Sequence, residues 1–223
     1  FKLGPIGAAL GTTLAQSISV LCALISMKYQ KSDLHIRKED FKTDSSIMKQ
    51  ILKVGLPVAV QDGCIQVAFI IITIIANSRG LNDAAAVGIV EKMISAIFIV
   101  PSSMLATVSA ISAQNIGAKR YDRAQSTLRY ALMITTIYGI CIAAIVEVNS
   151  NSLLSLFTKD STVILLGSQY ISSYIIDTIF AGIHFSFSGY FAADGKSYIG
   201  FLHNILSITL VRVPGSYLAS KMF

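Results

Sequence analysis

Residues 51–76 read ILKVGLPVAVQDGCIQVAFIIITIIA, and the only charged side chains among them are Lys53 and Asp62. A helix of about 20 predominantly apolar residues crosses the hydrocarbon core of a bilayer, which is about 30 Å thick. Pro57 falls in the first turns of the run, where a missing backbone N–H costs little. The run therefore predicts a transmembrane helix.

Similar runs recur along the rest of the chain, whose 223 residues are 53% hydrophobic and only 13% charged. Soluble domains usually carry about 25% charged residues, so this chain lacks the charge to solvate its surface. The sequence predicts an all-α membrane protein with about six transmembrane helices. The five further spans cover residues 5–27, 85–112, 127–146, 162–191 and 198–220.

Two of these spans are expected to depart from a straight helix. Pro101 lies inside span 85–112, where it removes one helical hydrogen bond and is expected to kink the helix. Span 162–191 is longer than a bilayer requires, so it is expected to tilt or bend.

Basic residues are unevenly divided between the connections. The connections at 28–50, 113–127 and 192–196 carry ten Lys and Arg residues, whereas the intervening links carry only Arg79 and Lys159. Basic residues of short connections stay on the cytoplasmic side of the membrane. The pattern predicts that the first set of connections is cytoplasmic.

Other function classes find little support in the sequence. The net charge is +6, but the basic residues lie between hydrophobic spans instead of on a soluble face, which argues against nucleic-acid binding. No Gly-rich phosphate loop, HExxH motif or nucleophile elbow occurs, so we expect neither an enzyme nor a cofactor. The three cysteines are expected to be core thiols, and the three histidines lie in different segments, so no metal site is predicted.

The candidate functional residues are the charges inside spans. Asp177 lies near the middle of span 162–191, Asp62 about twelve residues into span 51–76, and Glu91 in span 85–112. A carboxylate at mid-bilayer costs ~2.5–3.5 kcal/mol on insertion scales, so it usually faces a cavity or a partner. We therefore expect Asp177 and Asp62 to exchange H⁺ or Na⁺.

Polar neighbours accompany these acids on the predicted helices. Gln66 lies one turn after Asp62, Tyr174 lies three residues before Asp177, and His184 lies two turns after Asp177. Such stripes are typical of a water-filled cavity or of polar contacts between helices. A structural alternative also stays open, in which the acids form permanent pairs. The candidate pairs are Asp177 with Arg212 and Glu91 with Lys92.

Six short motifs follow one another along nearly the whole chain: GAALGT at 7–12 with Gln16, VGLP at 54–57, SAQNIGA at 112–118 after Pro101, LF at 156–157, DGK at 194–196 and RVP at 212–214. In this order and spacing they resemble the sixth to eleventh helices of multidrug and toxic compound extrusion (MATE) transporters. The resemblance implies that residues 1–27 form the last helix of an N-terminal lobe, residues 28–50 a cytoplasmic linker, and residues 51–223 five helices of the C-terminal lobe.

The resemblance also implies a function. Transporters of this family export organic, often cationic, drugs in exchange for H⁺ or Na⁺, by rocking two six-helix lobes around a central cavity. The expected partners are the lipid bilayer, small organic substrates and the missing N-terminal helices of a longer protein, in a bacterial plasma membrane. Relatives often carry an acid about two turns after the proline of the seventh helix, where this chain has Gln66 and not Asp62.

Two other functions are less consistent with the sequence than an antiporter. A lipid-linked oligosaccharide flippase of a related fold would favour a strongly basic cavity, for which Lys92 and Arg212 are too few. A non-transporting membrane subunit would explain the helices, but not two buried aspartates on different spans.

Overall fold

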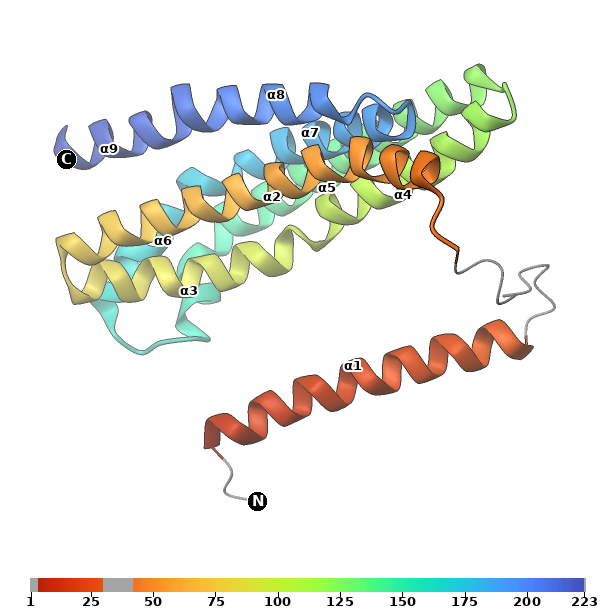
Figure 1. Cartoon of the computed structure of the whole chain (residues 1–223). Coiled ribbons are helices and arrows are strands. Elements are labelled where there is room, and N and C mark those ends of the chain that lie inside the picture. Colours follow the sequence, from red (N-terminus) through yellow and green to blue (C-terminus); the bar gives the residue numbers. More distant parts are fainter. Residues whose placement is uncertain (1–3, 30–41, 223) are drawn as a thin grey trace. The chain divides into compact units, whose positions relative to one another are not determined.

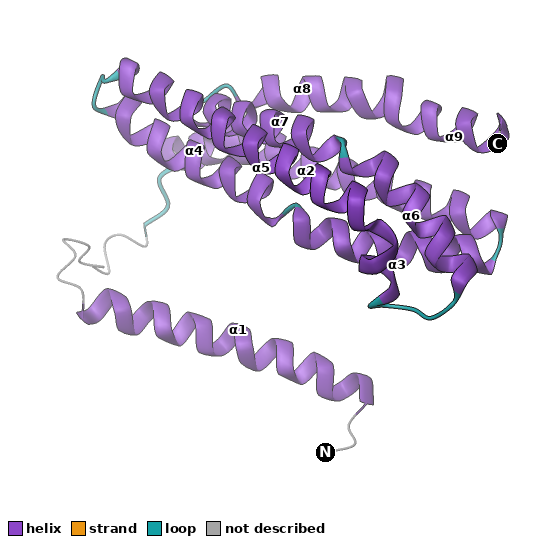
Figure 2. Ribbon diagram, turned by 180° about the vertical axis from the view of Figure 1, so that it is seen from behind, coloured by secondary structure: helices purple, strands orange, loops and turns teal. Residues whose placement is uncertain are grey.

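A computed structural model describes residues 4–29 and 42–222, and within these ranges every regular element is a helix (Figures 1 and 2). Short turns join successive helices from Ser45 onward. The elements are α1 (Gly4–Tyr29), α2 (Ser45–Arg79), α3 (Leu81–Ile97), α4 (Ile99–Gly117), α5 (Tyr121–Ser155), α6 (Ser161–Ile175), α7 (Asp177–Ala193), α8 (Ser197–Ser207), the π-helical turn η2 (Ile208–Arg212) and α9 (Val213–Met222).

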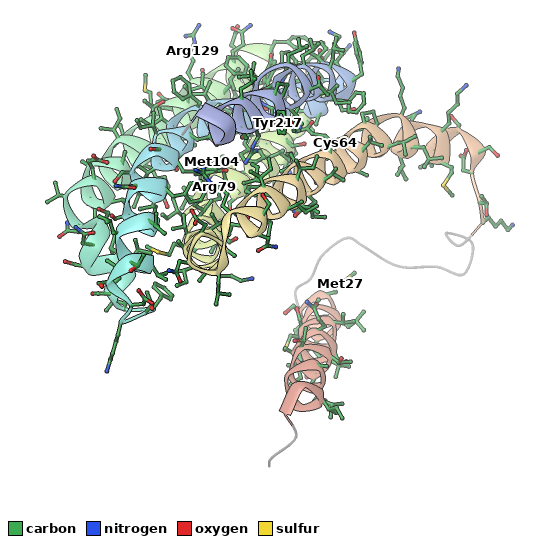
Figure 3. All side chains as sticks on the ribbon, turned by 90° about the vertical axis from the view of Figure 1, so that its left-hand side faces the viewer. Met27, Cys64, Arg79, Met104, Arg129 and Tyr217 are labelled. Atoms are coloured by element: carbon green, nitrogen blue, oxygen red, sulfur yellow. The ribbon has the colours of Figure 1, made fainter. Side chains whose placement is uncertain are left out.

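The chain divides into two compact units, Phe1–Ser45 and Ser46–Phe223. The described part of the first unit contains helix α1, whose large apolar side chains are exposed; Figure 3 labels Met27 near its C-terminal end. The second unit contains the remaining helices. Many of its large apolar side chains are also exposed, among them Ile70, Leu210 and Val211. An apolar exterior of this extent suits a surface that faces lipid.

The described helices include four that are long and apolar enough to cross a membrane. They are Ala9–Met27, Ser45–Arg79, Leu81–Gly117 and Tyr121–Ser155. The pair α6 and α7 makes a fifth candidate, bent by 40° at Ile176, which agrees with the expected bend in span 162–191. The predicted sixth span corresponds to the run α8–η2–α9, which the π-helical turn divides into shorter pieces. The chain is thus a multi-pass membrane protein with an all-α fold.

The core of the second unit lies between α3, α5 and α6. Side chains from these three helices form one buried apolar cluster. Both α3 and α5 pack along α6. The buried members are Val90, Met93, Ile94, Val146, Leu154, Ile171 and Ile175.

Helix α7 approaches two neighbours so closely that only glycine fits at the contacts. A Cβ atom added to Gly189 would lie 2.5 Å from the Leu105 carbonyl oxygen of α4. A Cβ atom on Gly182 would lie 2.7 Å from the Thr135 Cβ of α5. Small residues allow such contacts between helices in membranes, where no hydrophobic force drives helix association.

The predicted span 85–112 is broken at Phe98, about one turn before Pro101; α3 ends there and α4 begins. A proline cannot donate to the carbonyl four residues before it, which here belongs to Ile97. The Tyr138 hydroxyl of α5 donates a hydrogen bond of 2.9 Å to that carbonyl. The interruption is therefore compensated by a side chain of a neighbouring helix.

Several helices extend beyond the predicted apolar spans. Helix α5 covers Tyr121–Ser155, well past the predicted span 127–146, and α2 begins at Ser45, inside the predicted linker 28–50. The central part of that linker, residues 30–41, lies outside the described residues. The predicted link 77–84 shrinks to Gly80, whose φ of 141° is one that residues with a side chain rarely adopt.

Candidate functional site

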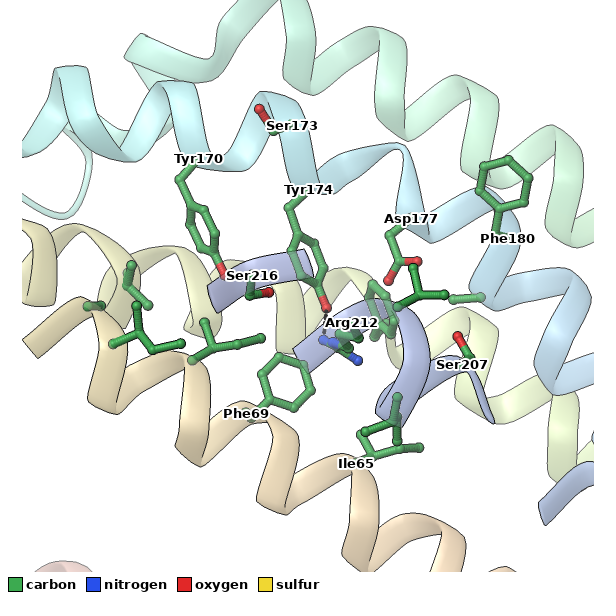
Figure 4. Close-up of a pocket in the computed structure, with 18 of the residues that line it drawn as sticks. Ile65, Phe69, Tyr170, Ser173, Tyr174, Asp177, Phe180, Ser207, Arg212 and Ser216 are labelled. Carbon is green, nitrogen blue, oxygen red and sulfur yellow. Dashed lines mark hydrogen bonds between the residues drawn. The ribbon is translucent and has the colours of Figure 1, made fainter. Parts of the chain in front are cut away.

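A cavity of about 920 Å³ lies in the second unit, lined by residues of α2, α3, α6, α7 and the run α8–η2–α9 (Figure 4). Most of its lining is apolar or aromatic. The aromatic residues are Phe69, Phe98, Tyr170, Tyr174, Phe180 and Phe185. Large apolar cavities with a few polar groups are typical binding sites for small organic molecules.

Arg212, the last residue of the π-helical turn, extends into this cavity (Figure 4). Its Nη2 donates a hydrogen bond of 2.7 Å to the Tyr174 hydroxyl. Its guanidinium carbon lies 4.5 Å from the centre of the Phe69 ring and 5.9 Å from the centre of the Tyr174 ring. Stacking on aromatic faces and a directed hydrogen bond together fix the orientation of this cation.

Asp177 lines the same cavity as the first residue of α7, directly after the break at Ile176. Among the described residues no ion pair joins its carboxylate to Arg212. The structural alternative, a permanent salt bridge between the two, is therefore absent from this conformation. A carboxylate at the N-terminus of a helix is favoured by the helix dipole.

Two of the predicted neighbours of Asp177 also face the cavity. Tyr174 accepts the hydrogen bond from Arg212, and its ring centre lies 6.0 Å from that of Tyr170. His184 lines the cavity two turns further along the same face of α7. Its Nε2 lies 3.4 Å from Gln61 Nε2, and its ring meets the His203 ring edge-on at 4.5 Å. The structure thus brings Asp177, Tyr174 and His184 together.

Glu91 lies outside the cavity lining. One of its carboxylate oxygens accepts a hydrogen bond of 3.0 Å from the Thr73 hydroxyl, which links α3 to α2. No ion pair joins Glu91 to Lys92 within the described part of the chain. The Glu91 carboxylate therefore joins two helices instead of lining the cavity.

Asp62 and Gln66 are exposed on α2, and neither lines the cavity. Gln61 faces inward instead and is only 1% exposed. Successive helix residues point about 100° apart, so a helix that buries Gln61 turns Asp62 away from the bundle. The structure therefore separates Asp62 and Gln66 from Asp177.

Sequence reasoning missed the aromatic and amide parts of the site. Phe69 and Asn204 line the cavity, and no property of an apolar span singles them out. Arg212 was not predicted as a site residue, although an arginine inside a span is itself a signal of function. No group of three or more His, Cys, Asp or Glu that could hold a metal occurs among the residues that the structure describes.

Comparison with known proteins matches residues 57–218 to the family model MatE. The probable multidrug resistance protein YoeA of Bacillus subtilis is 24% identical over 222 residues, covering 98% of this chain and 48% of the relative. The multidrug export protein MepA of Staphylococcus haemolyticus is 22% identical over 222 residues, covering 99% of this chain and 48% of the relative. The chain spans about half the length of the curated relatives it matches.

Solved structures give the same fold. A MOP superfamily transporter from Pyrococcus furiosus superposes with a TM-score of 0.85 at 18% identity, covering 99% of this chain and 50% of the other. An outward-facing multidrug resistance MATE family transporter superposes with a TM-score of 0.81 at 19% identity, covering 98% and 50%.

Proposed function

Since the chain belongs to the MatE family, we propose that it forms part of a secondary active antiporter that exports organic compounds in exchange for H⁺ or Na⁺. Multidrug transporters among its relatives support drug efflux as the activity. The proposed location is the plasma membrane, where the remaining helices of the protein would complete the transport path. Residues 1–27 would then form the last helix of the N-terminal lobe, and residues 51–223 would form most of the C-terminal lobe.

The observation that carries this proposal is the position of Asp177. A carboxylate lines an aromatic cavity of about 920 Å³ and stands at the bend between α6 and α7. Binding of an ion there would change the charge of the cavity at the point where the span already changes direction. Coupling of a carboxylate inside a membrane span to movement of helices is the requirement for alternating access.

Replacement of Asp177 by Asn in the full-length protein tests the coupling role. We expect Asp177→Asn to abolish ion-driven efflux of a fluorescent organic dye from vesicles under an imposed pH or Na⁺ gradient, with expression unchanged. The amide cannot exchange an ion, although it fills the same space. Asp62→Asn is expected to have a weaker effect, because Asp62 lies outside the cavity.

The matched control is Asp122→Asn, which removes an exposed carboxylate from the first turn of α5. It is expected to retain efflux. Efflux at the wild-type rate in Asp177→Asn would rule out the coupling role of that residue. Gradient-independent movement of lipid-linked sugars by the wild-type protein would instead favour the flippase alternative.

A further inference from the structure

The cavity carries more positive than negative charge. Its lining contains two guanidinium groups, those of Arg79 and Arg212, and a single carboxylate, that of Asp177. A charged ligand that enters an apolar cavity loses water and needs compensation from charges in the wall. The imbalance therefore favours a negatively charged ligand over a positively charged one.

The aromatic rings do not reverse this preference, because an internal cation already covers two of them. The Arg212 guanidinium lies over Phe69 at 4.5 Å and near the Tyr174 ring at 5.9 Å. A cationic ligand would have to share these ring faces with a like charge. Phe180 also lines the cavity and is 64% exposed, so its ring can contact an apolar group.

A second polar group points to the same class of ligand. Asn204 lines the cavity and is only 7% exposed, yet its Nδ2 has no hydrogen-bond partner. A buried donor without a partner is costly, which suits a site that a ligand completes. Arg212 has five N–H donors, of which one bonds the Tyr174 hydroxyl, so further donors remain for an acceptor.

We propose that this cavity binds an organic acid, with its apolar body against the aromatic rings and its carboxylate held by Arg212 and Asn204. Arginine binds carboxylates through two parallel hydrogen bonds, which gives this group its preference for planar anions. The proposal rests on the proposed function as a transporter of organic compounds, and it narrows their class away from cations. The anionic headgroup of a phospholipid would offer the same chemistry.

Direct binding to the full-length protein in phosphatidylcholine nanodiscs tests the proposal. Radiolabelled 2-naphthoate and 2-naphthylmethylammonium have the same aromatic body and opposite charges. We expect 2-naphthoate to bind at least about tenfold tighter than the amine, and Arg212→Gln to weaken its binding by about tenfold. Arg129→Gln is the matched control, since it removes the same charge from an exposed position of α5 outside the cavity (Figure 3).

Asn204→Leu provides a second variant that keeps the side-chain bulk and removes the unpaired donor. It is expected to weaken 2-naphthoate binding by roughly fivefold while leaving binding of the amine unchanged. Tighter binding of the amine by the wild-type protein would overturn the proposal. Unchanged 2-naphthoate affinity in both Arg212→Gln and Asn204→Leu would overturn it as well.

Nanodiscs that contain phosphatidylglycerol distinguish the two sources of the anion. If phosphatidylglycerol competes with 2-naphthoate, the anion in the cavity is a lipid headgroup. If 2-naphthoate binds without such competition, the anion is a free acid. Either result supports an anion site. Binding requires no ion gradient, so failed efflux with retained 2-naphthoate binding contradicts only the proposed function. Retained efflux without preference for the acid contradicts only this inference.

Discussion

The Ile97 carbonyl shows how one side chain can compensate for a proline inside a membrane-spanning segment. Pro101 has no backbone N–H to donate to this carbonyl, and the hydrocarbon core offers no water in its place. The Tyr138 hydroxyl supplies the hydrogen bond from α5, at 2.9 Å. The same contact therefore joins two helices at the point where the third predicted span is interrupted.

Removal of the Tyr138 hydroxyl is expected to destabilise the protein. Tyr138→Phe leaves the Ile97 carbonyl without this donor, at a cost of roughly 1 kcal/mol. We expect a lower melting temperature for the purified full-length protein. Tyr130→Phe, at an exposed position of the same helix, serves as the control and should leave the melting temperature unchanged.

The residue scale also shows why the candidate site could be predicted only in part. Asp177 was identified because a carboxylate in an apolar span is conspicuous in any sequence. The face on which Asp62 lies could not be identified, because lipid and protein core are equally apolar and leave no periodic pattern along α2. Gln61 and Asp62 are neighbours in the chain, yet only Gln61 is buried.

At the scale of elements, the apolar runs predicted where helices exist but not where they end. Hydropathy detects the part of a helix inside the bilayer, whereas α5 continues through polar residues at both ends. The bend at Ile176 has no proline to mark it; the length of span 162–191 allowed a bend without locating it. Its position depends on contacts of α6 and α7 with different neighbours, α3 and α4.

The close packing of α7 against α4 can be tested by a substitution at Gly189. Gly189→Ala adds one methyl group at a point 2.5 Å from the Leu105 carbonyl oxygen, so the two helices must separate. We expect a loss of about 1–3 kcal/mol in stability, measured as a lower melting temperature of the full-length protein. A melting temperature equal to that of the wild type would show that the helices are not in such close contact.

Gly88→Ala is the matched control, because Gly88 is also in a helix but has open space where its Cβ would lie. The same substitution there removes backbone freedom from the unfolded chain without a clash. It is expected to leave stability unchanged or to raise it by about 0.5–1 kcal/mol.

At the scale of the whole molecule, the fold class followed from composition, whereas the functional cavity did not. A chain with 13% charged residues has to place its helices in lipid, whatever their order. The cavity depends on which helices meet, and it combines residues from α2 and α7 that are more than a hundred positions apart. Only the three-dimensional arrangement joins Phe69, Asp177 and Arg212.

Orientation in the membrane is the remaining prediction at this scale. The turn between α4 and α5 carries Lys119 and Arg120, whereas the turn between α5 and α6 carries Lys159 and Asp160. Because basic residues are retained in the cytoplasm, the first turn should be cytoplasmic and the second external. The two turns lie at opposite ends of the single long helix α5, so they cannot share a side if that helix spans the bilayer.

Single cysteines at these turns report their location. In a full-length protein without its native cysteines, we expect Lys159→Cys to react with a membrane-impermeant maleimide in intact cells, and Lys119→Cys to react only after permeabilisation. Lys119 has a φ of 59°, a conformation that cysteine adopts less readily than glycine, so Arg120→Cys is a second probe of the same turn. The reverse labelling pattern would show that the orientation is opposite to the predicted one. Labelling of both turns from outside would mean that α5 does not cross the membrane.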